Sequence, residues 1–199
     1  QLYYETRGAG VPSSPLAWDG RFMSGELVQS ASDYPYRLSV RDAAGNTAVA
    51  AGNIPIDILV IREGDKLRID VPYIHFEPWS AELISREQDA ILYAQTQKAF
   101  ALLIPKLQKF PDYSIRIEGH AVRIFWWDEY RLGRAEERAV LEPLSLARAE
   151  KVRDELVARG VAAERLLLEG LGGTEPLVPH SDLAQRWRNR RVEFILLKE

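Results

Sequence analysis

The sequence predicts an α+β protein in two parts, a β-sandwich over residues 1–63 and a mixed domain over residues 64–199. Before about Ile61, apolar residues alternate with polar ones and no segment has helical spacing, which favours an all-β unit. From Leu67 onward, alternating runs are separated by amphipathic helical stretches, which indicates helices packed on a mixed sheet. Gly64-Asp65 interrupts two alternating runs with turn chemistry, so we place the domain boundary there.

Composition excludes several classes of function. The 199 residues carry a net charge of only −3 with acids and bases interspersed, so we expect no binding to nucleic acid. No apolar run is long enough to cross a bilayer. The absence of cysteine excludes disulfides and thiolate metal sites. Because the chain begins at Gln1 without a signal-like segment, we expect a processed or cut fragment.

The first part contains two alternating runs. Pro35 to Arg41 alternates strictly and predicts a half-buried strand, which ends at a turn over residues 42–46, where Gly45 and Asn46 allow positive φ. A second run, Ile54 to Val60, also alternates, and its Pro55 indicates an edge strand.

The second part reads as strands and helices in succession. We expect strands at 67–76, 113–118, 165–169 and 190–197, helical structure beginning at 78–82, and helices at 86–109 and 144–160. Pro105 is expected to kink or end the first long helix. Phe125, Trp126 and Trp127 favour a helix over 123–140 that buries at least one tryptophan, although this segment could instead cover a pocket.

Arg148 is the residue that poses the functional question. On a helical wheel it falls in the same arc as Leu144, Val152 and Leu156. An arginine among core-facing positions must pair with a buried acid or face an anion in a pocket.

Four short segments of the first part resemble the FlgD-type Ig-like repeat, a spacer or contact module of extracytoplasmic proteins. They are Trp18-Asp19-Gly20-Arg21, Ser24-Gly25-Glu26, Tyr34-Pro35-Tyr36-Arg37-Leu38 and Asp42-Ala43-Ala44-Gly45-Asn46. Only the later strands of such a repeat are recognisable, so we expect a truncated sandwich. Trp18 and the tyrosines are interpreted as its core and turn anchors, with a sugar platform as the alternative.

The second part resembles the OmpA-like peptidoglycan-associating domain. The resemblance rests on Phe110 to His120, on Leu144-Ser145-Leu146-Ala147-Arg148-Ala149, and on Gly170 to Gly173 followed by Asn189-Arg190-Arg191-Val192-Glu193. The resemblance covers the chain from about Leu67 onward. Together with the Ig-like segments, it makes the chain most similar to spirochaetal members of the family. The implied fold is a βαβαβ domain.

The resemblance implies a site for the stem-peptide residue diaminopimelate, whose carboxylate is held by the arginine at Arg148 and whose ammonium is held by an aspartate. The aspartate position is Val122 here, the preceding polar position is Ala121, and a family asparagine is Leu141. We therefore expect weakened or altered binding. The candidate peptidoglycan-binding residues are Arg148, His120, Ala121, Val122, Asn189 and Arg190. Three acids in connecting segments could return to the pocket: Asp128, Glu129 and Asp182.

The other groups of chemically reactive or charged residues give little indication of a specific site. No HxH or HExxH spacing links His75, His120 and His180, so we expect no zinc site. No pair of carboxylates is marked as a hydrolytic couple. Gly170 to Gly173 lacks the dinucleotide-binding pattern. Four arginines form a basic run: Arg186, Arg188, Arg190 and Arg191. We interpret Arg190 and Arg191 as strand-edge and salt-bridge residues, with a phosphate patch as the alternative.

The expected function is therefore a non-enzymatic module without cofactors that associates with peptidoglycan in the periplasm, near the outer membrane. Other envelope proteins are the expected partners of the Ig-like part. The alternative is a periplasmic protein–protein scaffold whose degenerate pocket no longer binds the wall.

Overall fold

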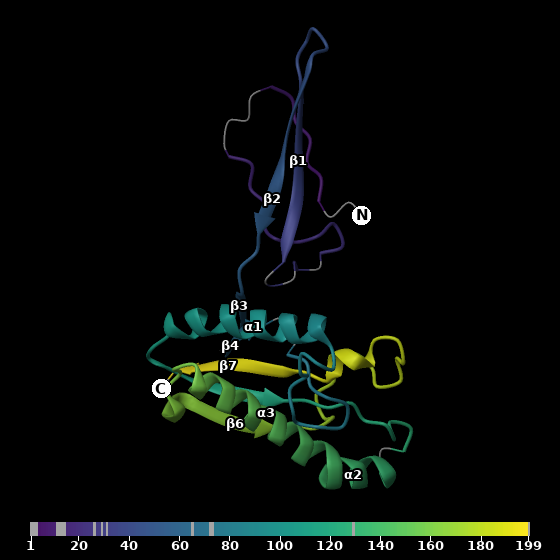
Figure 1. The fold of residues 1–199 in the computed structure, drawn as a ribbon. Coiled ribbons are helices and arrows are strands. Elements are labelled where there is room, and N and C mark those ends of the chain that lie inside the picture. The colour runs from purple at the N-terminus through teal and green to yellow at the C-terminus, as the bar shows by residue number, and fades with distance from the viewer. Residues whose placement is uncertain are drawn as a thin grey trace. The chain divides into compact units, whose positions relative to one another are not determined.

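A computed structural model describes residues 4–10, 15–25, 27–28, 30, 32–64, 66–71, 74–128 and 130–198 of the chain. It divides into two compact units, Gln1–Asp57 and Ile58–Glu199 (Figure 1). The sequence places the boundary a few residues later. The difference arises because strand β3 (Leu59–Glu63) pairs along its whole length with β4 (Lys66–Asp70) in the second unit. No described helix has the length and apolarity needed to span a membrane.

The first unit contains one antiparallel hairpin, β1 (Asp33–Arg41) and β2 (Thr47–Pro55). The predicted strand and turn are confirmed, but the expected half-burial of the strand is wrong, because every residue from Pro35 to Arg41 is exposed. The Asp42 carboxylate accepts hydrogen bonds from the Asn46 backbone N–H at 2.8 Å and from its side-chain amide at 2.9 Å. The second predicted strand, Ile54 to Val60, is wrong as a single strand, because β2 ends at Pro55 and β3 belongs to the other unit.

An aromatic cluster accompanies this hairpin. The Trp18 ring lies 5.8 Å from that of Tyr34 and 6.2 Å from that of Tyr4, and Phe22 lies 5.9 Å from Tyr34. The indole N–H of Trp18 donates to the Arg21 carbonyl at 2.7 Å. Trp18 is therefore a packing and turn anchor. Besides the hairpin, the described residues of this unit form one isolated bridge, Arg21↔Leu27, so the second sheet of a sandwich is not seen among them.

The second unit contains a mixed sheet, as predicted. It has five strands in the order β3-β4-β7-β5-β6, one more than expected, because β3 was assigned to the first part. Its remaining strands are β5 (Tyr113–Gly119), β6 (Leu166–Gly170) and β7 (Val192–Lys198). The pairing of β5 with β6 is parallel, and the other neighbours are antiparallel. The predicted strand from Leu67 to Phe76 is shorter in the structure, since β4 ends at Asp70.

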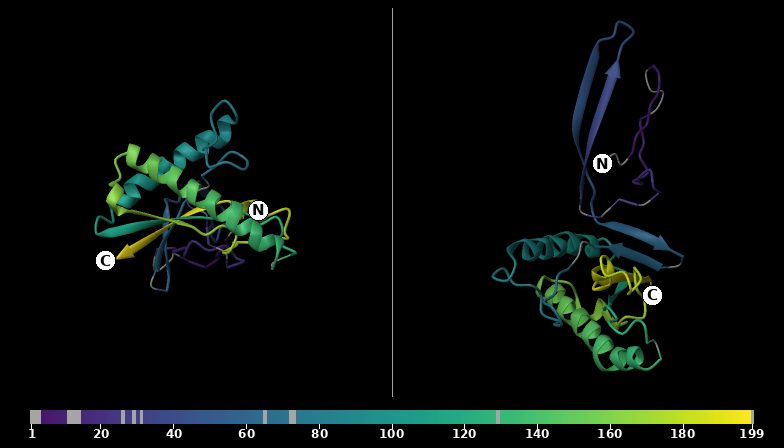
Figure 2. Two further views of the ribbon diagram at one scale, coloured as in Figure 1. Left: turned by 90° about the horizontal axis from the view of Figure 1, so that it is seen from below. Right: turned by 90° about the vertical axis from the view of Figure 1, so that its right-hand side faces the viewer.

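Helices α1 (Ala90–Gln108) and α3 (Glu142–Ala158) both pack on one face of this sheet (Figure 2). The fully buried core joins Phe100 and Leu103 of α1, Val152 of α3, and Ile117 and Phe194 of paired strands. In β5, Ile115 and Ile117 alternate with Arg116 and Glu118, as the period of two in a strand requires.

The helix expected to begin at 78–82 is wrong, whereas the helix expected over 86–109 is present and is shorter at both ends. Residues 78–82 form turns and not a helix, with an isolated bridge between Phe76 and Leu83 and a positive φ of 56° at Trp79. The helix α1 begins after Asp89, whose carboxylate caps the N–H groups of Ile91 and Leu92, and it continues through Pro105 to Gln108. Pro105 lies in the last turn, so the hydrogen bond that its missing N–H removes is close to the end of the helix at Gln108.

A continuous helical run leads into α3. It consists of α2 (Leu132–Glu136), the π-helical turn η1 (Glu137–Leu141) and α3 itself. The beginning of α3 lies directly on the ends of β5 and β6, because a Cβ atom on Gly119 would lie 1.9 Å from the Ser145 carbonyl oxygen. The absence of a side chain at Gly119 therefore sets how closely the helix approaches the sheet. Two short 3₁₀ turns complete the unit, η2 (Ala163–Arg165) and η3 (Arg186–Asn189).

Candidate functional site

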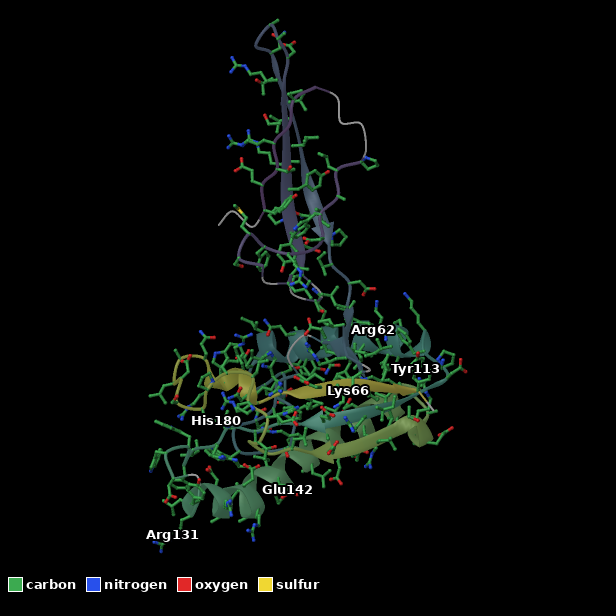
Figure 3. The ribbon with its side chains drawn as sticks, turned by 180° about the vertical axis from the view of Figure 1, so that it is seen from behind. Arg62, Lys66, Tyr113, Arg131, Glu142 and His180 are labelled. Atoms are coloured by element: carbon green, nitrogen blue, oxygen red, sulfur yellow. The ribbon has the colours of Figure 1, made fainter. Side chains whose placement is uncertain are left out.

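A pocket of about 270 Å³ opens where α3 meets the end of β5. Four segments line it: the turn at Trp79, residues 121–124, the region from η1 into α3, and the segment before β7. The last two segments are marked by Glu142 and His180 in Figure 3. Its lining residues are Trp79, Ala121, Val122, Ile124, Leu141, Leu144, Arg148, Leu183, Arg186, Trp187 and Arg190.

Arg148 is the buried cation of this pocket, only 3% exposed. Its Nε donates to the Ser80 carbonyl at 3.0 Å, and its guanidinium carbon lies 5.1 Å from the centre of the Phe76 ring. Burial, followed by the nearby charge of Arg190, lowers the pKa of Arg148 to about 10. The side chain therefore stays charged at neutral pH although its surroundings disfavour that charge.

Two further arginines, Arg186 and Arg190, line the same pocket, and no carboxylate does so among the described residues. Within this part of the chain, neither they nor Arg148 form an ion pair with an acid. Unpaired guanidinium groups in a partly dry cavity favour an anionic ligand, and a carboxylate matches their paired N–H donors.

Two of the three acids that could have returned to the pocket, Asp128 and Asp182, do not supply a negative charge there. Asp128 accepts from the Arg131 N–H at 3.0 Å. Asp182 accepts from the N–H groups of Ala184 and Gln185 at 3.1 and 3.0 Å. Neither lines the pocket. Glu129, the third candidate, lies outside the described residues.

Four of the six residues predicted for the site, Arg148, Ala121, Val122 and Arg190, line the pocket together. The other two, His120 and Asn189, do not. The segment that carries Ala121 and Val122 is tied down by backbone bonds, since the His120 N–H donates to the Arg191 carbonyl at 2.9 Å. The Ala121 N–H donates to the Gly172 carbonyl at 2.6 Å.

Asn189 is fully buried and organises the chain on one side of the pocket. Its side-chain oxygen accepts from the N–H groups of Leu177 and Val178 at 2.8 and 3.0 Å, and its amide donates to the Val178 carbonyl at 2.8 Å. The same amide lies 3.3 Å from Nδ1 of His180, whose Nε2 lies 2.9 Å from the Gly173 carbonyl. We assign Asn189 a positioning role because these bonds use its polar atoms.

Two glutamates clamp the segment after Val122. The buried carboxylate of Glu136 accepts from the N–H groups of Ile124 and Phe125 at 3.0 Å each. Glu137 accepts from the Gly173 N–H at 2.7 Å and pairs with Arg123 at 2.9 Å. These glutamates, the last residue of α2 and the first of η1, therefore hold the pocket segment 121–124 in place, in agreement with the frequent occurrence of π-bulges at functional sites.

The aromatic run of this segment behaves differently from the prediction. Phe125, Trp126 and Trp127 lie outside any helix and are 36%, 42% and 61% exposed. Trp127 packs edge-on against both neighbours, at ring distances of 5.6 and 5.7 Å. The expectation that a helix here buries a tryptophan is wrong, because the Glu136 carboxylate holds the backbone N–H groups of Ile124 and Phe125 at a bend; of the described residues in the predicted segment 123–140, only those from Leu132 onward are helical.

His120 belongs to a separate buried cluster on the opposite face of the sheet, with Glu118 and Glu193, whose possible ligand atoms lie within 4.8 Å of one another. Both glutamates already pair with arginines, Glu118 with Arg116 at 2.6 Å and Glu193 with Arg191 at 2.7 Å. Burial, and then the charge of Arg191, lower the pKa of His120 to about 4, so its ring is neutral at pH 7. Burial raises the pKa of Glu118.

The three histidines do not come together. His75 lies 3.1 Å from the Gln95 side chain, His180 contacts Asn189 and Gly173, and His120 is in the glutamate cluster. Each has separate neighbours, which agrees with the lack of metal-ligand spacing between them.

Several lining residues escaped prediction: Trp79, Ile124, Leu183, Arg186 and Trp187. Trp79 and Leu183 lie in turns, where no periodicity marks an inward face. The basic run did draw attention to Arg186, and the lack of any acid between Arg186 and Arg191 could have signalled an anion site.

The chain is similar to a known protein family and to individual proteins. The model of the OmpA family matches residues 86–190. The peptidoglycan-binding protein ArfA of Mycobacterium tuberculosis (strain H37Rv) is 33% identical over 91 residues, which are 46% of this chain and 24% of ArfA. The peptidoglycan-associated lipoprotein of Rhizobium meliloti is 33% identical over 93 residues, 45% of each chain.

The fold has counterparts among solved structures. A putative MotB-like protein from Desulfovibrio vulgaris superposes with a TM-score of 0.54 at 24% identity, over 72% of this chain and 82% of that one. This likeness concerns the fold alone. The chain spans about a quarter of ArfA and less than half of the lipoprotein. The spirochaetal likeness and the Ig-like repeat stay predictions.

Proposed function

Because the chain belongs to the OmpA family, we propose that it is a non-enzymatic module of the cell envelope that associates with peptidoglycan through the pocket around Arg148. Two of its relatives carry peptidoglycan binding or association in their names, ArfA and the Rhizobium meliloti lipoprotein. The proposed location is the periplasm, in association with the outer membrane.

The observation that carries the proposal is the buried, unpaired charge of Arg148. This guanidinium is 3% exposed and has a carbonyl and an aromatic ring as its neighbours, and no described residue supplies the counter-ion that such burial normally requires. A stem-peptide carboxylate would supply that counter-ion through two parallel N–H···O bonds. Arg190, at the pocket edge, would add to the attraction.

The binding is proposed to differ from that of the family. With Val122 in place of the aspartate, the ammonium of diaminopimelate has no carboxylate partner among the described lining residues. An uncompensated ammonium in a partly dry pocket costs affinity, on the order of a few kcal/mol in the worst case. Association with a wall that carries free diaminopimelate is therefore expected to be weak.

The test is co-sedimentation of the purified chain with isolated sacculi. Arg148→Ala should reduce the pelleted fraction to background, because it removes the proposed carboxylate partner. Arg153→Ala is the matched control on the same helix, since Arg153 pairs with Asp154 at 2.8 Å and lies outside the pocket. It should pellet like the wild type. Equal pelleting of wild type and Arg148→Ala would refute wall binding through this pocket.

A protein–protein scaffold is the second candidate, and the hairpin β1–β2 favours it. Every residue of the two strands except Tyr34 is exposed, including Leu38, Val40 and Val49 at 45%, 58% and 50%. An isolated two-stranded ribbon is only marginally stable, so these faces are suited to contact with another envelope protein. Absence of pelleting at any practical concentration would favour this function over wall binding.

A further inference from the structure

We propose that the pocket selects a carboxylate whose neighbouring nitrogen is acylated, and discriminates against the same carboxylate beside a free ammonium. The proposal rests on the proposed function, because it defines which chemical form of the wall peptide the Arg148 pocket accepts. It makes the substitution at Val122 a change of selectivity instead of a simple loss of binding.

The first argument is the sign of the pocket's charge. Arg148, Arg186 and Arg190 contribute three positive charges, and no acid among the described lining residues offsets them. Arg148 and Arg190 already disfavour each other, since the charge of Arg190 contributes to the lowered pKa of Arg148. An ammonium brought into the same cavity of about 270 Å³ would add a like charge to this set, whereas a carboxylate without an ammonium would relieve it.

The second argument is the chemistry of the wall beside Arg148. Val122, Leu141 and Leu144 line the pocket with side chains that offer no hydrogen-bond acceptor. An ammonium needs several acceptors when it leaves water, and here it would lose its hydration without replacement. An amide nitrogen carries no charge and has a single N–H, so its burial costs much less.

The third argument is the space for the acyl group. Trp79 and Trp187 line the pocket and are 67% and 43% exposed, which leaves part of their rings open. Planar aromatic rings offer contact area to amide and methylene groups. An acyl substituent can therefore gain contacts in the region where a free ammonium would be repelled.

Two parts of a peptidoglycan sheet supply this chemistry. One is a cross-linked stem, in which the side-chain amine of the dibasic residue is bound in an amide while its carboxylate stays free. The other is the carboxyl terminus of a stem peptide, whose nitrogen lies in the preceding peptide bond. Both present a carboxylate on a carbon that bears an acylated nitrogen.

The experiment compares one batch of sacculi before and after acetic anhydride has converted its free amines to acetamides. The wild-type chain is expected to reach half-saturation at a concentration about tenfold lower on the acetylated sacculi, because the like charge is removed. Val122→Asp should reverse this preference, and its neutral counterpart Val122→Asn should retain it. Circular dichroism would verify that each variant is folded.

The outcomes separate the two proposals. A wild-type chain that pellets through Arg148 but prefers untreated sacculi, or does not distinguish the two, overturns the selectivity and leaves wall binding intact. Pelleting with neither preparation overturns both. If a folded Val122→Asp variant still binds acetylated sacculi more tightly than untreated sacculi, the charge argument is also wrong.

Soluble competitors distinguish the two sources. N-acetyl-D-alanine represents the peptide terminus, and diaminopimelate acetylated on its side-chain amine represents the cross-link. Either should displace the chain from acetylated sacculi, and the stronger of the two identifies the source. If inorganic phosphate displaces it better than both, the pocket is a general anion site and the inference is wrong.

Discussion

Replacing Arg148 by methionine tests whether this arginine serves ligand binding rather than the fold. Methionine retains the length of the aliphatic stem and removes the charge. Burial, and then the charge of Arg190, lower the pKa of Arg148 to about 10, which corresponds to roughly 3 kcal/mol by which the fold disfavours the charged side chain. This cost applies at every pH below the folded pKa, and therefore at neutral pH.

The substitution also removes favourable contacts. Loss of the bond to the Ser80 carbonyl costs about 1 to 2 kcal/mol. Loss of the cation–π contact with Phe76 costs about 1 kcal/mol. The free energy of unfolding should therefore stay within about 1 kcal/mol of the wild type, on the stabilising side, while sacculus binding is lost.

The assay is urea denaturation at pH 7 in parallel with pelleting. Arg165→Met is the contrasting variant, because Arg165 donates to the carbonyls of Tyr113, Leu107 and Phe110 at 3.1, 3.3 and 2.5 Å. Its loss should cost about 3 kcal/mol. If Arg148→Met destabilises the chain as much as Arg165→Met, Arg148 is a structural residue and the reasoning fails.

Three further predictions concern the surroundings of the pocket. Gly119→Ala should lower the free energy of unfolding, measured by urea denaturation, by about 3 kcal/mol or more, because its Cβ would lie 1.9 Å from the backbone oxygen of Ser145. A variant as stable as the wild type would contradict the close approach of α3. Unfolded histidine binds a proton near pH 6.5 but His120 does so only near pH 4, so stability should fall as pH falls across this range, by up to about 3 kcal/mol. His120→Gln should lose that part of the pH dependence, and an unchanged slope would assign it to other groups. Asn189→Ala should accelerate amide exchange at Val178 and weaken pelleting less than Arg148→Ala does; unchanged exchange would show that Asn189 does not hold this segment.

Local patterns were enough to predict most regular elements of the second unit. Strand β5 and helix α3 follow from the alternation of Ile115 and Ile117 and from the helical spacing of Val152 and Leu156, because each pattern is complete within one element. The single strand predicted from Ile54 to Val60 was wrong because a local pattern does not show which unit each residue belongs to. Its alternation continues across the break at residues 56–58, and only the pairing of β3 with β4 reveals where one unit ends.

The candidate site was predictable in part. The sequence motifs identified Arg148 and Val122, which line one pocket, and Arg190 with them. The contribution of Ser80 could not be foreseen, since it acts through a backbone carbonyl next to Trp79, a residue with positive φ. Sequence periodicity does not indicate which backbone carbonyl accepts a hydrogen bond from an arginine far away in the sequence.

The most direct test of the central claim, an anion site centred on Arg148, is the NMR signal of its side-chain Nε–H during titration with soluble N-acetylated muropeptides. The account predicts a saturable shift of this signal together with the amides of Ala121 and Val122, and no shift of those amides in Arg148→Met. Shifts confined to the β1–β2 hairpin, with Arg148 unaffected, would contradict it.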